Sequence, residues 1–304
     1  MAEFKKPSNG MEEIKWFIGF LIFFVVAWFI GGGILREVTS PFIEPPVPVT
    51  GTAAGNKTAP SKTVPQTGSF SGDLKAIEQK SGASSLKGLL ELSVNNYGSA
   101  VSANEEYVML QLSDSAPSRV LLTGMIIKSE ASGRSATIGK GAYLPQQGTI
   151  NAEELVYLEP GGIAYVVTGR APVGYSLRVN KCTGYFEQFQ NFVPQLPIEC
   201  PLPKTEPLPP PPNSPSDACL QYIDNMRRCR IEPNSPVELG EECRRFIRDS
   251  FTYPRCVSAH KSDADFYKNE WHLYLSRDLP LWKSTREVIT LLDATGKVVD
   301  TVTY

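Results

Sequence analysis

Short apolar runs, some continuous and some alternating with polar residues, follow one another through the middle of the chain. They cover residues 89–94, 106–112, 120–127, 155–158 and 163–168. Gly, Pro, Ser or Asp residues separate the runs, and apolar runs of this length between turn residues are typical of β-strands. The pattern predicts a mainly β fold, a β-sandwich whose first part covers residues 86–200.

The strand pattern returns at the end of the chain. Residues 287–293 and 298–302 are apolar or alternating, and a Gly-containing turn at 294–296 lies between them. Two such runs joined by a short turn predict a β-hairpin. We therefore expect residues 271–304 to supply the closing strands of the same sandwich.

Between the two β regions the apolar period changes from two residues to three or four. This helical spacing extends over residues 219–226 and again over 243–251, and the turn-forming segment 232–236 separates the two stretches. Helical spacing on both sides of a turn predicts a hairpin of two antiparallel helices. The hairpin is expected to occupy an insertion at residues 217–270.

A proline-rich spacer leads into this insertion. It covers residues 201–216, and the prolines at 209–212 form an unbroken row. Proline locks its own φ angle and has no N–H to donate, so such a row favours an extended polyproline conformation over any packed element. The spacer is expected to act as a semi-rigid connector.

Residues 16–35 form an uncharged run near the beginning of the chain. Its 20 residues, as a helix, match a hydrocarbon core of about 30 Å. A buried core helix is one alternative, but the run has no polar face. A cleavable signal peptide is another, but Ile34, Leu35 and Arg36 follow the glycines where a signal peptidase prefers small residues. The run predicts a transmembrane helix that stays in the bilayer.

The positive charges around this run predict its direction. Lys5, Lys6 and Lys15 precede it, whereas only Arg36 lies within the next twenty residues. Lys and Arg are retained on the cytoplasmic side of a membrane segment. Residues 1–15 are therefore expected to be a cytoplasmic tail, and everything after the helix to be extracytoplasmic, in a single-pass protein of the cell membrane.

A stalk is expected between the membrane and the folded part. Residues 36–72 are rich in Pro, Thr, Ser and Gly and poor in large apolar side chains. Such a segment buries too little apolar surface to offset the entropy of an ordered chain.

All six cysteines lie in the second half of the chain: Cys182, Cys200, Cys219, Cys229, Cys243 and Cys256. An even number of cysteines in an exported segment predicts a framework of disulfides. Zinc is the alternative, although the spacing lacks the close C-x2-C pairs of structural zinc sites. No metal or cofactor is expected.

Antiparallel helices would bring the four cysteines of the insertion together in two pairs. The inner pair would be Cys229 with Cys243, and the outer pair Cys219 with Cys256. Four cysteines allow three pairings, so this is one hypothesis among three.

The remaining two cysteines, Cys182 and Cys200, lie in segments bounded by Pro or Gly. A bond between them would stabilise the fold by about 3 kcal/mol in the chain-entropy description.

Charge excludes one broad class of function. The net charge is −2 and charged residues make up 20% of the chain, so no overall field favours nucleic acid, and no nucleic-acid partner is expected. The one basic concentration consists of Arg227, Arg228, Arg230, Arg244, Arg245 and Arg248. Acidic residues lie close to all of these in the sequence, which predicts a solvated helix surface of mixed charge. An anion or wall-polymer contact is the alternative.

Catalytic motifs are missing from the sequence. His260 and His272 do not have the spacing of metal ligands. Ser84 and Lys87 match an S-x-x-K pattern, but its usual partner motifs are absent. No phosphate-binding glycine loop is found, so we expect a protein that is not an enzyme and has no catalytic residues.

Four segments resemble the lamin-tail domain family. They are residues 106–110, 120–127, 158–162 and the closing stretch 281–304. The resemblance covers roughly residues 86–170 and 281–304 and implies an immunoglobulin-like β-sandwich. Met125 stands where the family commonly has an aromatic residue, and the cysteine-rich insertion is a further departure. The family motifs specify a fold and no chemistry.

Two functions follow as hypotheses. The first is a non-enzymatic, membrane-anchored binding or scaffolding module of the cell envelope, whose partner is an envelope protein or a wall polymer. The second is an accessory subunit of a membrane-associated hydrolase or other envelope enzyme complex, because lamin-tail domains often accompany enzymes in exported proteins.

The expected topology has a direct test. Protease added to intact cells or spheroplasts should cut within residues 37–72 and release a soluble fragment, because the stalk is expected outside the membrane. Immunoblotting of the released fraction measures the cut. Protection of the stalk, with cleavage only after the membrane is dissolved, would contradict the orientation.

Overall fold

The computed structural model describes residues 18, 20–26, 77, 82–94, 102–211 and 213–304. The chain divides into two units, Met1–Val64 and Pro65–Tyr304, and the sheets and helices below all belong to the second. Among the described residues, no helix has both the length and the apolar character needed to span a bilayer. The predicted cytoplasmic tail, the stalk and most of the predicted transmembrane helix lie outside the described residues, so these remain predictions.

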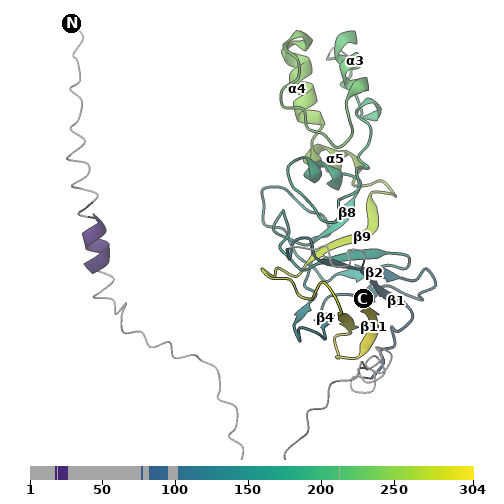
Figure 1. Cartoon of the computed structure of the whole chain (residues 1–304). Helices are drawn as coiled ribbons and strands as arrows, with labels where there is room; N and C mark the ends of the chain where they lie inside the picture. The colour runs from purple at the N-terminus through teal and green to yellow at the C-terminus, as the bar shows by residue number, and fades with distance from the viewer. Residues whose placement is uncertain (1–17, 19, 27–76, 78–81, 95–101, 212) are drawn as a thin grey trace, which may run out of the picture. The chain divides into compact units, whose positions relative to one another are not determined.

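The second unit is mainly β, as the sequence predicts (Figure 1). A five-stranded sheet has the order β1-β2-β7-β9-β8 and a four-stranded sheet the order β11-β10-β4-β5. The five strands of the first sheet are β1 (Leu90–Ser93), β2 (Tyr107–Leu112), β7 (Ile163–Val167), β9 (Tyr267–Tyr274) and β8 (Leu177–Asn180). Those of the second are β11 (Val298–Thr303), β10 (Val288–Leu292), β4 (Ile126–Ser129) and β5 (Ser135–Thr137). A small third sheet pairs β3 (Val120–Leu121) with β6 (Tyr157–Leu158).

One apolar core takes side chains from both large sheets. Val108, Leu110 and Leu112 of β2 are buried, whereas the intervening Met109 is half-buried and Gln111 is exposed, as a strand with one face inward requires. The same cluster includes Trp271 of β9 and residues of β4, β10 and β11. The alternation that predicts the strands thus also determines which side chains reach the core.

The predicted terminal hairpin is confirmed. Strands β10 and β11 pair in antiparallel register across the Gly296 turn, and β10 also pairs with β4. The amide of Leu92 in β1 donates to the Asp300 carboxylate at 2.7 Å. The end of the chain is therefore held by both large sheets.

A buried carboxylate organises the approach to this hairpin. Glu287 is fully buried and accepts four hydrogen bonds. The donors are the Ser129 hydroxyl at 2.8 Å and the amides of Ala131, Lys283 and Val288 at 3.1, 2.8 and 2.9 Å. A carboxylate has no proton to donate, so its two oxygens suit a site where every neighbouring group is a donor.

The predicted helical region holds three α-helices rather than two. They are α3 (Asp217–Asn225), α4 (Gly240–Ser250) and α5 (Tyr253–His260), accompanied by the short 3-10 helices η1 (Thr183–Gln188), η2 (Pro203–Thr205) and η3 (Val237–Leu239). The second predicted stretch breaks at Thr252, whose side chain caps α5 by accepting from the Arg255 amide. Pro254 follows in the first turn of α5, where a missing N–H costs nothing.

The expected antiparallel hairpin is wrong, because α3 and α4 run in the same direction. Cys219 and Cys243, both near the beginning of their helices, are bonded to each other, and Figure 1 shows the two helices side by side. One small core joins their inner faces from these cysteines to Met226 and Phe251 at the helix ends. The connection 226–239 is long enough to return beside α3, since extended chain advances about 3.3 Å per residue against about 1.5 Å in a helix.

Replacing Glu287 by Gln should destabilise the fold by roughly 2–4 kcal/mol. The new amide N–H₂ would face two backbone or hydroxyl donors and leave them without an acceptor. Denaturant unfolding of the full chain, followed by the fluorescence of the buried Trp271 and Trp282, measures the loss. The control Glu91→Gln, at an exposed position of β1, should change the free energy of unfolding little, and equal stability of the two variants would contradict the role of Glu287.

Candidate functional site

All six cysteines are bonded in three disulfides, which confirms the predicted disulfide framework and leaves no thiolate for zinc. The bonds are Cys182–Cys256, Cys200–Cys229 and Cys219–Cys243. The expected pairings were Cys182 with Cys200, Cys219 with Cys256 and Cys229 with Cys243, and all three are wrong.

Helix direction is the physical reason for the error. Parallel helices bring their first turns together, so Cys219 meets Cys243. Cys229 follows the end of α3 and Cys256 lies in α5, and both pack in a second core beside the five-stranded sheet. There they find Cys200 and Cys182.

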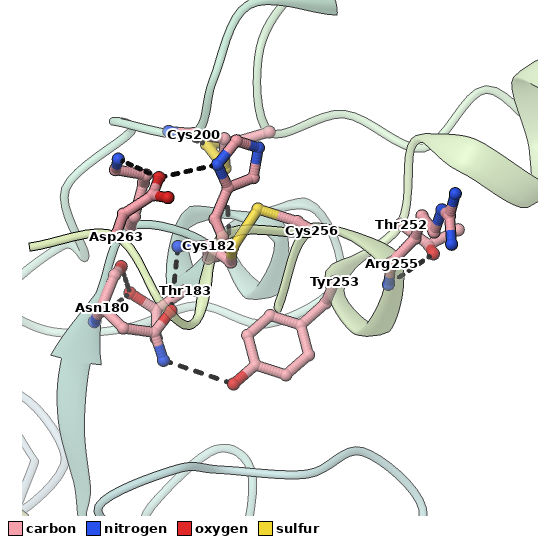
Figure 2. The surroundings of a disulfide bond; sticks show 12 residues. Asn180, Cys182, Thr183, Cys200, Thr252, Tyr253, Arg255, Cys256 and Asp263 are labelled. Carbon is pink, nitrogen blue, oxygen red and sulfur yellow. Dashed lines mark hydrogen bonds and ion pairs between the residues drawn. A yellow bond between two sulfur atoms is a disulfide. The ribbon is translucent and has the colours of Figure 1, made fainter. Parts of the chain in front are cut away.

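The Cys182–Cys256 bond lies in a tightly hydrogen-bonded region between β8 and α5 (Figure 2). Asn180, the last residue of β8, accepts from the Cys182 amide at 2.9 Å through its side chain and from the Thr183 hydroxyl at 2.8 Å through its carbonyl. Its amide nitrogen points toward the Tyr253 hydroxyl at 3.4 Å. This polar ring fixes the turn from which η1 begins.

Tyr253 links α5 to a distant loop. Its buried hydroxyl donates to the carbonyl oxygen of Pro145 at 2.6 Å, and its ring lies 4.5 Å from that of Phe186 in η1. Burial raises the pKa of the Tyr253 hydroxyl far above its ordinary value. The hydroxyl is therefore a permanent donor, and the loop that begins at Pro145 is held against the disulfide-bonded region.

Close packing around Cys229 requires a glycine. A Cβ on Gly184 would overlap the Cys229 sulfur and lie 2.8 Å from the carbonyl oxygen of Pro197. η1 can therefore lie directly on the Cys200–Cys229 bond.

His260 closes an ionic network between the spacer, α5 and the end of β8. Its Nδ1 lies 2.8 Å from Asp263 and its Nε2 lies 2.8 Å from Glu206, just after η2. Lys181 bonds both Asp263, at 2.8 Å, and Asp265, at 2.5 Å. Burial alone would lower the pKa of His260, but the hydrogen bonds and negative charges of Asp263 and Glu206 outweigh it and raise the pKa.

The other histidine is part of the five-stranded sheet. His272 is fully buried on β9, with Nε2 3.0 Å from a Glu270 oxygen and its ring centre 5.2 Å from that of Tyr165. No partner for its Nδ1 is found within the described part of the chain.

The basic residues are divided in the structure. Arg244 pairs with Glu241 at 2.5 Å and Arg230 with Glu232 at 3.4 Å. Arg227 and Arg230 also line a hollow of about 370 Å³ at the end of α3. Nearby acids thus pair part of this basic concentration, as the mixed-charge prediction states.

One hollow of this unit is formed by residues to which the sequence assigned no role. Its volume is about 570 Å³, and residues of the segments 146–150, 172–175 and 186–190 line it. We name it the glutamine groove after Gln146, Gln147 and Gln190. Among the described residues, no acidic or basic side chain lines it.

Two polar side chains, Tyr175 in the wall and Asn151 beside it, hold the glutamine groove in shape. Asn151 accepts from the Gln146 amide at 2.6 Å and donates to the Gln146 carbonyl at 3.0 Å, which closes the loop on itself. Tyr175 donates to the same carbonyl at 3.4 Å. At the rim, Ile150 is fully exposed and Phe189 is 60% exposed.

Comparisons with known proteins do not assign the chain to a family. A scan against models of protein families finds no match, and searches of curated proteins and of solved structures find no significant similarity. The resemblance to the lamin-tail family therefore remains a prediction.

The His260 network should make stability depend on pH in a defined window. Because the folded chain raises the pKa of His260, the stabilisation is complete below the ordinary histidine pKa of about 6.5 and is lost as the pH rises through the folded-state pKa. In strong acid it is lost when Asp263 becomes protonated, and the hydrogen bonds from Lys181 and His260 lower the pKa of that carboxyl below its ordinary value.

Denaturant titrations of the wild type and of His260→Gln, at intervals from about pH 5 to about pH 9, measure this contribution. Over this range, the difference in the free energy of unfolding between wild type and variant should be largest near about pH 5 and should decline toward alkaline pH. Lys261→Gln is the control, since it removes an exposed positive charge from the next position. A difference that grows with pH would contradict the network.

Proposed function

We propose that the chain is a membrane-anchored, extracytoplasmic binding module of the cell envelope that carries no chemistry of its own. The observation that carries this proposal is the glutamine groove, which exposes Phe189 and Ile150 on its rim while disulfides and hydrogen bonds hold its walls. A preformed hollow with apolar walls and a few polar groups is the usual form of a ligand site.

Two further features support a membrane-anchored, extracytoplasmic location. The uncharged run 16–35, with lysines before it, is typical of a single-pass anchor with a cytoplasmic N-terminus. Three disulfides suit an oxidising compartment outside the cytoplasm.

The proposed fold type is an immunoglobulin-like β-sandwich of the lamin-tail kind. Its support is the single core between two large sheets and the C-terminal hairpin that completes one of them. On this proposal the helices α3, α4 and α5 form an insertion in the sandwich, and α5 holds the walls of the glutamine groove through Tyr253.

Site-specific crosslinking in the native membrane tests the binding role. A photo-crosslinking residue in place of Phe189, in the full chain, should give a discrete adduct with an envelope component after illumination. The matched control carries the same residue in place of Val237, which is 71% exposed on η3 and does not line the groove.

The outcome distinguishes the two hypotheses. An adduct with a wall polymer or a non-enzymatic envelope protein supports the binding module. A stoichiometric adduct with a membrane-associated hydrolase would favour the accessory-subunit alternative. Equal adducts at both positions, or none at position 189, would overturn the groove as the contact surface.

A further inference from the structure

We infer that the glutamine groove binds a neutral saccharide, with the ring of Phe189 against the non-polar face of a sugar. This inference rests on the proposed function and adds the chemical class of the ligand.

The volume of the groove fits a small ligand better than a protein surface. Its 570 Å³ lies within the range of about 300–1,000 Å³ that is usual for small-molecule sites. The walls are two loops and the end of a 3-10 helix. None of the strands in the described part of the chain lines the groove, so an added peptide strand would find no sheet edge there.

The charge of the lining selects an uncharged ligand. The charged groups around His260 and Lys181 are paired with one another. An anionic or cationic ligand would lose its hydration in the groove without gaining an opposite charge, which is costly.

The glutamines select a ligand that both donates and accepts. Within the described part of the chain, the side-chain amides of Gln147 and Gln190 make no hydrogen bond, so each offers donors and an acceptor to a ligand. A sugar hydroxyl is itself a donor and an acceptor and matches both ends of an amide. A polyproline segment, the other neutral ligand of aromatic grooves, has no N–H and would leave the amide oxygens unmatched.

Phe189 supplies the apolar contact. It follows η1 directly and is 60% exposed, whereas Phe186, one turn earlier, is buried against Tyr253. An aromatic ring held at a rim by a rigid turn presents a flat face to a ligand at little entropic cost. The C–H groups on one face of a sugar ring fit such a surface, while the hydroxyls at the ring edge reach the glutamines.

Calorimetric titration of the full chain tests the inference. A polyoxyethylene detergent is required, because detergents with sugar headgroups would compete for the groove. The neutral probes are the tetramer of N-acetylglucosamine and cellotetraose. Tetragalacturonate, of the same length but anionic, and pentaproline are the contrasting probes.

We expect saturable binding of at least one neutral tetrasaccharide and none of tetragalacturonate. Phe189→Ala should weaken that binding roughly tenfold, a loss of about 1.4 kcal/mol, and Val237→Ala should leave it unchanged. Both changed side chains are exposed, and mapping of the three disulfides in each variant checks that the fold is retained.

Two results would overturn the inference. One is the absence of saturable binding by either neutral tetrasaccharide, and the other is binding that Phe189→Ala leaves unchanged. Binding of pentaproline in place of saccharide would also overturn the inference, because it would show that the groove binds polyproline segments. If crosslinking at position 189 still yields a specific partner, the binding module stands and only the saccharide inference fails.

Discussion

The Cys182–Cys256 bond is the constraint on which the rest of the helical region depends. It joins the end of β8 to α5 across 74 residues. In the chain-entropy description, closing a loop of this length reduces the entropy of the unfolded chain and so stabilises the folded state by about 4 kcal/mol. Because α5 is held at this point, Tyr253 can reach both η1 and the loop after Pro145. These two contacts of Tyr253 help to set the shape of the glutamine groove, because Phe186 and the loop after Pro145 form parts of its walls.

The parallel arrangement of α3 and α4 carries an electrostatic cost that the sequence offsets. Each helix has a partial positive charge at its N-terminus, and a bond between Cys219 and Cys243 brings these ends together. The first turns contain Asp217 in α3 and Glu241 and Glu242 in α4. Negative side chains at these positions compensate the adjoining dipoles, so the disulfide closes an arrangement that charge already favours.

Some charged groups of this unit hold segments together, and among the described residues none lines the groove. Glu287 collects four donors beneath the hairpin, and His260 joins the spacer to α5 through Glu206. The exposed apolar side chains of Phe189 and Ile150 have no such internal task. A rigid frame with a neutral, partly apolar rim is suited to recognition of an uncharged ligand.

Local pattern predicts only part of the secondary structure, since β5 and β8 lie outside the predicted strand runs and β9 begins inside the predicted helical insertion. The period of two predicts the strands, and the turn before Gly296 predicts the hairpin that β10 and β11 form. The break before α5 is also local, since Thr252 is a cap and Pro254 belongs in a first turn. These features depend on residues that are neighbours in the sequence, so the sequence is enough to predict them.

Tertiary structure alone decided the cysteine pairing and the groove. The connection 226–239 is long enough for either helix direction, so the spacing of the cysteines allows several pairings, and only packing against the second core selects one. The groove combines segments 146–150, 172–175 and 186–190, whose residues carry no shared motif. Their meeting depends on the Tyr253 hydrogen bond and the Cys182–Cys256 bond, which are long-range contacts that no local pattern encodes.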